Sequence, residues 1–261
     1  MQESPGSSYW LTVISVHRDD HQNLRKTLKS VSRQKTQDVE YLVVDGSKDL
    51  VTTIEICKEY LGGNAKVIPQ TPQGIYSAMN IGLAHAQGHY VYFLNAGDIF
   101  HSEQVLHELK LIVSSQDPLW VYGGVQFIDR IGRQRLAPTF DYDKERKHNF
   151  RAGRFPMQPA TLVQTEVLRS LGGFDLALQI AADYKVVLSL SKVASPLFWN
   201  GTVVDFALGG DSSVKWINAL QEAHRARVEV FSLSGLARIA DFVLSTPVYI
   251  RGLASRMMGR V

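Results

Sequence analysis

Short apolar runs alternate with segments of helical periodicity over the first third of the chain, and this alternation is what most constrains the fold. Each segment between the runs carries apolar residues three or four positions apart, which predicts a helix. Strands that alternate with helices in this way form a mostly parallel sheet covered by helices. We therefore predict a fold of the α/β class. The runs that predict strands are Leu11–Val16, Tyr41–Val44, Lys66–Ile68 and His89–Leu94.

The pattern after Asp98 is less regular, and no clear linker interrupts it. We divide the chain into a main domain of residues 1–232 and a helical tail of residues 233–261. The glycine pair inside one apolar run predicts a bulge in that strand. The elements expected in this part are a helix at Ser102–Ser114, a bulged strand at Trp120–Phe127, a helix at Asp183–Ala194, two short strands at Phe198 and Val203–Ala207, and mostly helix after Val214.

Composition excludes several functional classes. A net charge of +3 over 261 residues argues against a dedicated nucleic-acid-binding protein. The single cysteine, Cys57, cannot form an internal disulfide, which fits a reducing compartment. Its apolar neighbours in the sequence predict a buried core thiol rather than a nucleophile. Because the sequence shows no signal peptide and no run of about 18 uncharged apolar residues, we expect a cytoplasmic protein.

Polar residues follow two of the predicted strands. Asp45 ends the second run, and the turn from Asn95 to Asp98 follows the fourth. Open α/β sheets bind their ligands at the carboxyl edge of the strands. A carboxylate at that edge with no adjacent cationic residue suits a divalent cation that carries phosphates. The alternatives are a helix cap for Asp98 and an Asx-turn for Asp45.

Five blocks of sequence occur in a specific order and spacing between Leu11 and Arg227: LTVISV, YLVVDGSKD, GIYSAMNIGLAHAQGHYVYFLNAGD, LGGFD with AADYKVVLSL, and FALGGDSS. Together they resemble family 2 of the inverting glycosyltransferases, and within it the branch of colanic acid and other polysaccharide gene clusters. The resemblance implies a GT-A fold, in which a mostly parallel, Rossmann-like sheet has flanking helices, here with a helical C-terminal tail. It also implies transfer of a sugar from a nucleotide-sugar donor to a glycan or a lipid-linked saccharide.

The resemblance implies a divalent metal, Mg²⁺ or Mn²⁺, bound through Asp98. The metal would balance the negative charge that grows on the departing diphosphate. Asn95 stands where many relatives carry the first carboxylate of an Asp-x-Asp motif. It would then orient the sugar or a metal-bound water, and the charge of the cation would be less well balanced.

The nucleotide is expected at the first two strand ends. In relatives, the carboxylate equivalent to Asp45 accepts a hydrogen bond from the base. In this chain, Gly46 would let the base or ribose approach closely, and Ser47 would add a hydrogen bond. Ser15 would line the same pocket. Asn80 would lie beside the diphosphate, and its alternative is a single polar residue in a plain core helix.

Two departures from the family pattern bear on the donor. Relatives usually carry Thr-Tyr-Asn where this chain has His17-Arg18-Asp19, and Asp where it has Ser77. Arg18 would replace the missing tyrosine by stacking on the base. The resemblance favours a UDP-sugar, and these departures leave GDP and dTDP donors open.

The acceptor side needs a general base that removes the proton of the attacking hydroxyl. Asp183 occupies the matching place in the family pattern, and its alternative is a cap for the helix that follows it. Asp175 is the second candidate for the base. Gln158 is a candidate for contact with the acceptor or the sugar. Arg227 would contact phosphate or belong to a solvated face.

The tail from Leu236 to Val261 mixes apolar residues with four arginines and has almost no acidic residues. Such a composition fits the surface of an anionic membrane, where a lipid-linked acceptor would lie. The alternative is a helix packed on the main domain. We predict an inverting, metal-assisted glycosyltransferase, cytoplasmic or at the inner face of the membrane. The alternatives are a relative that binds nucleotide sugar or glycan without turnover, and a nucleotidyltransferase, whose Gly-rich basic loop is missing here.

Overall fold

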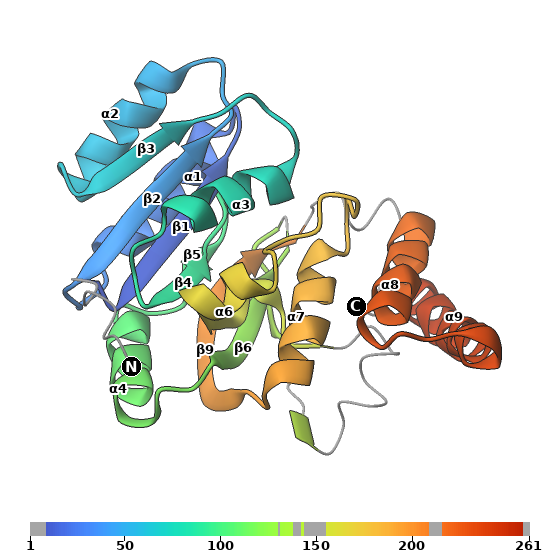
Figure 1. Cartoon of the computed structure of the whole chain (residues 1–261). Coiled ribbons are helices and arrows are strands. Elements are labelled where there is room, and N and C mark those ends of the chain that lie inside the picture. The colour runs from blue at the N-terminus through green and yellow to red at the C-terminus, as the bar shows by residue number, and fades with distance from the viewer. Residues whose placement is uncertain (1–8, 130, 138–141, 144–154, 209–215, 258–261) are drawn as a thin grey trace.

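A single sheet with helices on both faces forms the body of the protein in the computed structural model (Figure 1). The structure describes residues 9–129, 131–137, 142–143, 155–208 and 216–257, without the side chains of residues 216 and 248–257. Strand residues alternate between the two helical layers. Ile14 and Leu42 pack toward α3, α6 and α7, and Leu11 and Val43 pack toward α1, α2 and α4.

The first half of the chain forms the parallel part of the sheet, in the order β3-β2-β1-β4. Parallel strands are buried on both faces, so their sequences are continuous apolar runs. Asp20 and Asp49 cap the first two helices through their side chains. This confirms the predicted alternation. Its elements are β1 (Leu11–His17), α1 (His21–Ser32), β2 (Val39–Asp45), α2 (Leu50–Leu61), β3 (Ala65–Pro69), α3 (Ile75–His85) and β4 (Tyr90–Phe93).

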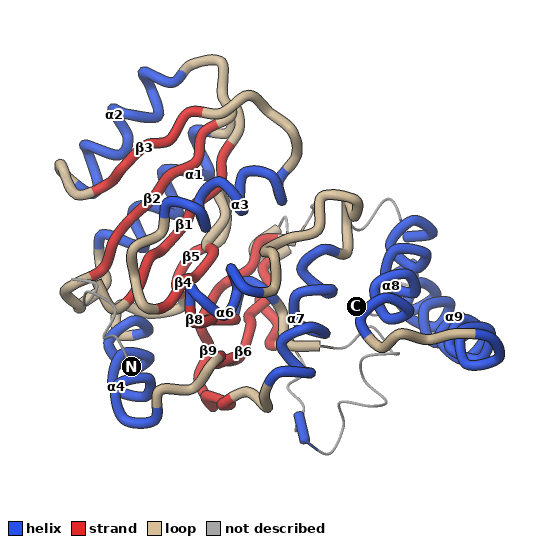
Figure 2. Tube along the Cα trace, viewed as in Figure 1, coloured by secondary structure: helices blue, strands red, loops and turns tan. Residues whose placement is uncertain are grey.

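The sheet continues from β4 through β8, β6, β9 and β5, which Figure 2 shows beside the parallel part. The strands β8 and β5 are antiparallel to their neighbours, whereas β6 and β9 are parallel to each other. The predicted bulge is confirmed, because the β6 and β9 register shifts at Gly124. These strands are β5 (Ile99–Phe100), β6 (Trp120–Ile128), β7 (Gln134–Leu136), β8 (Thr161–Gln164) and β9 (Leu197–Ala207).

The prediction of two short strands at Phe198 and Val203–Ala207 is wrong, because β9 is one continuous strand. Asn200, Gly201 and Thr202 interrupt the apolar pattern at its centre. Gly201 lies opposite the bulge of β6, where the carbonyl oxygen of Gly201 would come within about 3 Å of an added Cβ at Gly123 or Gly124. Close backbone approach at the bulge therefore keeps the strand continuous.

The remaining helices follow the sheet strands, and two of them extend the molecule. In Figure 1, α8 and α9 lie beyond α7, away from β1 to β3. Among the described residues, no helix combines the length and the apolar character needed to cross a membrane. The helices are α4 (Val105–Gln116), η1 (Gln158–Ala160), α6 (Thr165–Ser170), α7 (Ala182–Val193), α8 (Trp216–Val230) and α9 (Gly235–Met257).

Cys57 lies in the core on α2, as predicted, and burial raises the pKa of its thiol to about 11. The thiol therefore stays protonated at neutral pH, which disfavours a nucleophilic role. The spacing of apolar residues predicts Ile54, Cys57 and Leu61 on the inward face of α2, and the structure differs at one position. Ile56 is fully buried, whereas Ile54 is only half-buried.

A test of the fold uses Gly88, which begins the turn into β4. A Cβ at this position would lie 2.4 Å from backbone atoms of Leu11 and Thr12. We expect Gly88→Ala to lower the free energy of unfolding by about 1–3 kcal/mol, because the backbone of β1 must shift. Urea unfolding measures this change. Gly63→Ala is the matched control, since its Cβ would meet nothing within 4 Å, and equal losses in both variants would contradict the packing.

Candidate active site

Four polar side chains lie at the carboxyl edge of the parallel strands, and we call them the strand-end cluster: His17, Asp45, Gln70 and Asn95. His17 ends β1 and pairs in register with Asp45, which ends β2 and pairs with Pro69 of β3. Gln70 follows β3, and Asn95 follows β4. Each residue therefore comes from the end of a different strand, at the edge where ligands of such sheets bind.

Every member of the strand-end cluster has a buried polar atom without a hydrogen-bond partner in the described part of the chain. These atoms are both ring nitrogens of His17, Oδ2 of Asp45, Oε1 of Gln70 and Oδ1 of Asn95. An unpaired buried polar group costs about 1–3 kcal/mol, so such groups are rare in native proteins. Their concentration at one edge indicates a site that a polar ligand completes.

One oxygen of the Asp45 carboxylate is bonded within the protein, and the other is available to a ligand. Its Oδ1 accepts a hydrogen bond from Ser47 N at 2.7 Å, so the Asx-turn exists, and its Oδ2 stays available. Ser47 Oγ accepts from Asp19 N at 2.7 Å. Gly46 N donates to His17 O at 2.9 Å. These bonds tie the loop after β2 to the loop after β1. Asp45, Gly46 and Ser47 thus form one fixed loop at this edge, and the buried Ser15 lies on β1 two residues before His17. Their contact with a nucleotide stays a prediction.

His17 is a site candidate that the sequence reasoning missed. Its imidazole is buried, and Nε2 lies 4.0 Å from Asp45 Oδ1. Burial lowers the pKa of His17 and outweighs the opposing effect of Asp45. The ring is therefore neutral at pH 7, with one hydrogen-bond donor and one acceptor. The available signal was its position, a polar residue at the end of a fully buried strand.

The Thr27 side chain of α1 holds the turn from Asn95 to Asp98 by hydrogen bonds. Thr27 Oγ1 donates to Asp98 O at 2.8 Å and accepts from Gly97 N at 3.0 Å. Asp98 is only 5% exposed, and its Oδ1 accepts a hydrogen bond from Ala207 N at 3.4 Å. The capping alternative for Asp98 is wrong, because Gln104 is the N-cap of α4 and makes no side-chain cap bond.

Burial raises the pKa of Asp98 to about 7, against the opposing hydrogen bond from Ala207. A cation close to Asp98 would favour the ionised carboxylate and so restore its negative charge. Among the described residues, no group of three or more His, Cys, Asp or Glu side chains gathers to hold a metal. The oxygens that fit a hard cation at this turn are the Asp98 carboxylate and the unpaired Asn95 Oδ1. This turn fits Mg²⁺ or Mn²⁺ if phosphate and water supply the other ligands.

Asp183 lies in the first turn of α7, half-buried, and not at its N-cap, which is Ala181. The capping alternative is therefore wrong. Its Oδ1 accepts from Tyr184 N at 2.8 Å and from the Tyr76 hydroxyl at 3.2 Å. Burial raises the pKa of Asp183, and these two hydrogen bonds only partly oppose it. A carboxylate with a raised pKa is a better proton acceptor once it is ionised.

Glu222 of α8 holds the segment before α7, and the sequence reasoning missed it. Its carboxylate accepts three backbone hydrogen bonds, from Gln179 N at 3.0 Å, Ile180 N at 2.7 Å and Ala181 N at 2.9 Å. Hydrogen bonds to a carboxylate are stronger than neutral ones. Glu222 therefore fixes the start of α7, where Asp183 lies. No local sequence signal reveals contacts across more than 40 residues.

An aromatic chain connects Asp183 with the end of β4. Phe93 of β4 meets the Phe174 ring edge-on at 5.1 Å, and Phe174 stacks on Tyr76 at 5.6 Å. The Tyr76 hydroxyl then reaches Asp183. No hydrogen bond joins Asp183 directly to Asp98 or to the strand-end cluster in the described residues. This chain of contacts links Asp183 to β4, and the convergence of Asp183 and Asp98 on one site stays a prediction.

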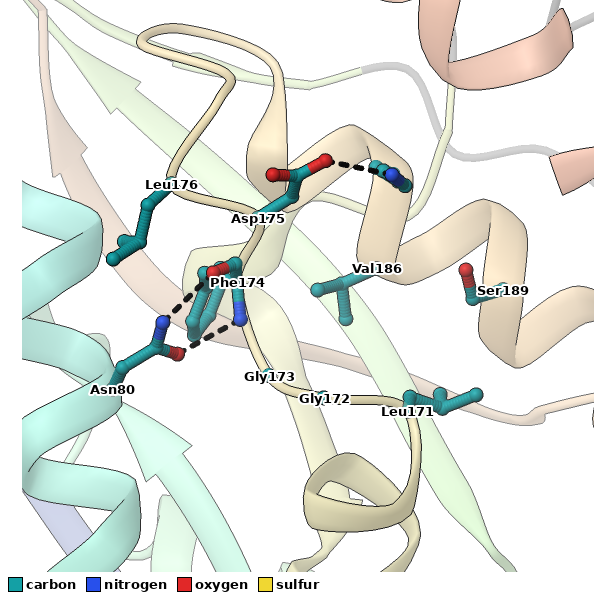
Figure 3. Close-up of a pocket in the computed structure, with 10 residues that line it drawn as sticks. Asn80, Leu171, Gly172, Gly173, Phe174, Asp175, Leu176, Val186 and Ser189 are labelled. Atoms are coloured by element: carbon teal, nitrogen blue, oxygen red, sulfur yellow. Dashed lines mark hydrogen bonds and ion pairs between the residues drawn. The ribbon is translucent and has the colours of Figure 1, made fainter. Parts of the chain in front are cut away.

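Asn80 holds the turn that carries Phe174. Its Nδ2 donates to Phe174 O at 2.7 Å and its Oδ1 accepts from Phe174 N at 2.8 Å, as Figure 3 shows. Both ends of the amide are therefore occupied by backbone. Contact of Asn80 with the donor stays a prediction, and the observed bonds resemble its structural alternative. Gln158 is similarly inward, with Nε2 3.4 Å from Phe93 O.

A cavity of about 450 Å³ lies beside this turn, between α3 and α7 (Figure 3). Asn80, residues 171–176 and Lys185 line much of it. Lys185 Nζ lies 2.7 Å from Asp175 Oδ2 and lowers the pKa of Asp175, which makes this second candidate a weaker base. Neither Asp98 nor Asp183 lines the cavity.

The structure also bears on the expectations for Arg227 and Arg18. Arg227 neither faces a phosphate site nor belongs to a solvated face, because it is 2% exposed and paired with Asp241. Arg18 is exposed at the loop after β1. The glycine-rich part of the fifth sequence block, residues 209–213, lies outside the described residues.

Comparison with known proteins gives one family. The profile described as Glycosyl transferase family 2 matches residues 12–170. An uncharacterized glycosyltransferase of Mycobacterium tuberculosis is 29% identical over 212 residues, which cover 78% of this chain and 77% of the relative. A PGL/p-HBAD biosynthesis glycosyltransferase of Mycobacterium bovis is 32% identical over 120 residues, covering 45% of this chain and 46% of the relative.

Two solved structures show a similar fold at low sequence identity. S. aureus TarS 1-349 in complex with UDP-GlcNAc superposes with a TM-score of 0.67 and 14% identity, covering 92% of this chain and 72% of that chain. The mannosyltransferase PcManGT from Pyrobaculum calidifontis, in complex with GDP-Man and Mn²⁺, gives 0.65 and 17%, covering 98% and 77%. These likenesses confirm the predicted GT-A fold.

The raised pKa of Asp98 has a testable consequence for stability. Between pH 3.8 and about pH 7 the unfolded carboxyl ionises while the folded one stays protonated, so its contribution to stability is lost as pH rises. In EDTA, we expect Asp98→Asn to be more stable than the wild type at pH 8. This advantage should be about 2–3 kcal/mol smaller at pH 5, at about 1.4 kcal/mol per pH unit.

Urea unfolding at both pH values measures this difference. Asp129→Asn is the control with the opposite sign, because the Arg133 hydrogen bond lowers the pKa of Asp129. Its substitution removes a charge that favours the folded state. An Asp98→Asn advantage that is independent of pH would contradict the raised pKa.

Proposed function

Because the chain belongs to glycosyl transferase family 2, we propose that it transfers a sugar, with inversion, from a UDP-sugar to a glycan or lipid-linked acceptor in polysaccharide biosynthesis. The single observation that carries this proposal is the strand-end cluster, whose buried polar atoms lack partners where a nucleotide would bind. The resemblance of the five sequence blocks to the polysaccharide-cluster branch of the family supports this part of the proposal. The lone, buried Cys57 fits a cytoplasmic location.

The chemistry of the strand-end cluster favours uracil as the base. Uracil presents one imide N–H between two carbonyl oxygens, and Asp45 offers one available oxygen, Oδ2. Neutral His17 supplies a ring N–H for a carbonyl next to that imide. Guanine presents two adjacent donors, and one of them would have to share Asp45 Oδ1 with Ser47 N. Gly46, Ser47 and Ser15 complete the nucleoside side of the proposed site.

The turn from Asn95 to Asp98 is the proposed place of the divalent metal, Mg²⁺ or Mn²⁺. Asp98 would be its protein ligand, with Asn95 beside it. The metal would supply positive charge against the diphosphate of the donor. The solved complex of PcManGT with GDP-Man and Mn²⁺ is consistent with this assignment. The protein itself contributes the fixed turn, which Thr27 holds through two hydrogen bonds.

Asp183 is the proposed general base on the acceptor side. It would take the proton of the acceptor hydroxyl as that oxygen attacks the anomeric carbon from the face opposite the diphosphate. Tyr76 orients one carboxylate oxygen, and the segment before α7 is fixed by Glu222. The raised pKa of Asp183 makes its ionised carboxylate a stronger proton acceptor. Asp175 is less suitable because Lys185 holds it in an ion pair.

The assignment of the base-binding residue is tested by Asp45→Asn. If the asparagine oxygen keeps the bond from Ser47 N, its amide group faces the imide N–H, donor against donor. We expect UDP affinity, measured by calorimetry with Mn²⁺, to fall about 10- to 100-fold, the cost of leaving buried donors unpaired. The control Asp49→Asn lies in the same loop and caps α2, and asparagine caps as well as aspartate. Unchanged UDP affinity in Asp45→Asn would contradict the proposal.

Turnover is tested by Asp183→Asn, which keeps the shape of the side chain and removes the base. We expect kcat for transfer to fall about 10²- to 10⁴-fold while UDP-sugar affinity stays within twofold. The measurement uses UDP released in the presence of Mg²⁺ or Mn²⁺. Asp175→Asn is the matched control and should retain turnover. No turnover by the wild type with any nucleotide sugar, despite binding, would favour the non-catalytic alternative.

A further inference from the structure

The helix α9 is oriented inside out, with polar residues toward the protein and apolar residues toward solvent. Among residues 235–247 of α9, whose side chains the structure describes, Asp241 and Ser245 are the buried ones. Its outward side chains are what we call the outer stripe: Leu236, Ile239, Val243 and Leu244, each more than half exposed. A surface helix of a soluble protein normally presents the opposite pattern. The outer stripe therefore lacks the cover that such a face requires.

The orientation of α9 is fixed by directional bonds. Arg227 Nε of α8 donates to both carboxylate oxygens of Asp241, at 3.1 and 3.0 Å. His224 Nδ1 lies 2.9 Å from Asp241 Oδ2. Both members of the Arg227–Asp241 pair are nearly fully buried. A rotation of α9 that buried its outer stripe would expose this ion pair and break these bonds, so the stripe is held outward.

The charge of the tail indicates which kind of surface contacts the outer stripe. Residues 235–261 contain four arginines and one aspartate, and that aspartate is the buried Asp241. After Asp241 the sequence has Arg251, Arg256 and Arg260 and no acidic residue. A second copy of the same tail would bring like charges together. A bilayer with anionic headgroups offers both an apolar boundary for the stripe and negative charge for the arginines.

We propose that α9 lies on an anionic membrane surface, with its outer stripe in the boundary between headgroups and acyl chains. This attachment would bring the enzyme to the layer that holds a lipid-linked acceptor. It does not depend on the donor or on turnover. Arg227 also donates to the Tyr184 hydroxyl at 3.1 Å, so the orientation of α9 is coupled to α7, the helix that carries Asp183.

The test is co-sedimentation of the full chain with vesicles, without nucleotide sugar. One set contains phosphatidylcholine alone, and the other contains about one third phosphatidylglycerol, a fraction that gives a strongly negative surface. We expect binding to the anionic set that weakens at least tenfold between low and high salt. The variant Leu236→Ser with Ile239→Ser and Val243→Ser should lose at least tenfold in partition. Charge reversal with Arg238→Glu, Arg251→Glu and Arg256→Glu should abolish the preference for anionic vesicles.

The matched control removes equally exposed apolar residues elsewhere: Val51→Ser with Leu111→Ser and Ile131→Ser. It should bind vesicles as the wild type does. Circular dichroism of all variants reports whether each remains folded. Equal pelleting of the stripe variant and the wild type would overturn the proposal. So would a wild-type dimer in analytical ultracentrifugation that the stripe variant converts to a monomer without any vesicle binding, because the stripe would then be a subunit interface.

Since vesicle binding is measured without substrate, its failure is distinguishable from failure of the proposed transfer reaction. A protein that binds anionic vesicles but does not turn over would retain the membrane surface and lose the enzymatic assignment. A protein that turns over with a soluble acceptor but ignores vesicles would do the reverse.

Discussion

The parallel register of β1, β2 and β3 is the constraint on which the site depends. It places His17 opposite Asp45 and Asp45 opposite Pro69, so three consecutive strands end along one line. Polar side chains at those ends are brought together before any ligand is present. Backbone bonds such as Gly46 N to His17 O and Gln70 N to Asp45 O hold these strand ends in place. Polar side-chain atoms of the strand-end cluster have no hydrogen-bond partner among the described residues. Buried polar atoms without hydrogen-bond partners destabilise the folded protein, and hydrogen bonds to a bound nucleotide would offset that loss.

The two proposed catalytic carboxylates are buried for different purposes. Asp98 lies against the end of β9 with a single backbone donor, Ala207 N. Such an environment penalises its charge and so favours a cation beside it. Asp183 has two donors, and one of them, Tyr76, also contacts Ile180 O. These hydrogen bonds orient the carboxylate and partly oppose the rise in its pKa that burial causes. The same physical effect, burial, thereby prepares one group for a metal and the other for a proton.

Local signals explain which parts could be predicted from the sequence. The helices begin where Asp20 and Asp49 supply cap oxygens, and the first four strands are apolar runs that need no long-range information. The prediction of two strands near Phe198 was wrong because pairing across the bulge of β6 decides the continuity of β9. No local feature of the sequence indicates Glu222, since its partners are backbone groups before α7. Asp45 and Asp98 are candidates from the sequence because strand ends and turns are local signals, whereas the candidacy of His17 depends on the strand register.

The Arg227–Asp241 pair shows why an exposed apolar stripe can persist. A buried ion pair contributes little net stability, since desolvation offsets its attraction, but breaking it leaves an uncompensated charge. Such a contact therefore selects an orientation more than it strengthens an interface. Had α9 been attached through apolar contacts, the same energy would have drawn Leu236, Ile239 and Val243 inward. Attachment through a polar, directional bond leaves those side chains outside, and Arg227 extends the same bond network to Tyr184 beside the proposed base.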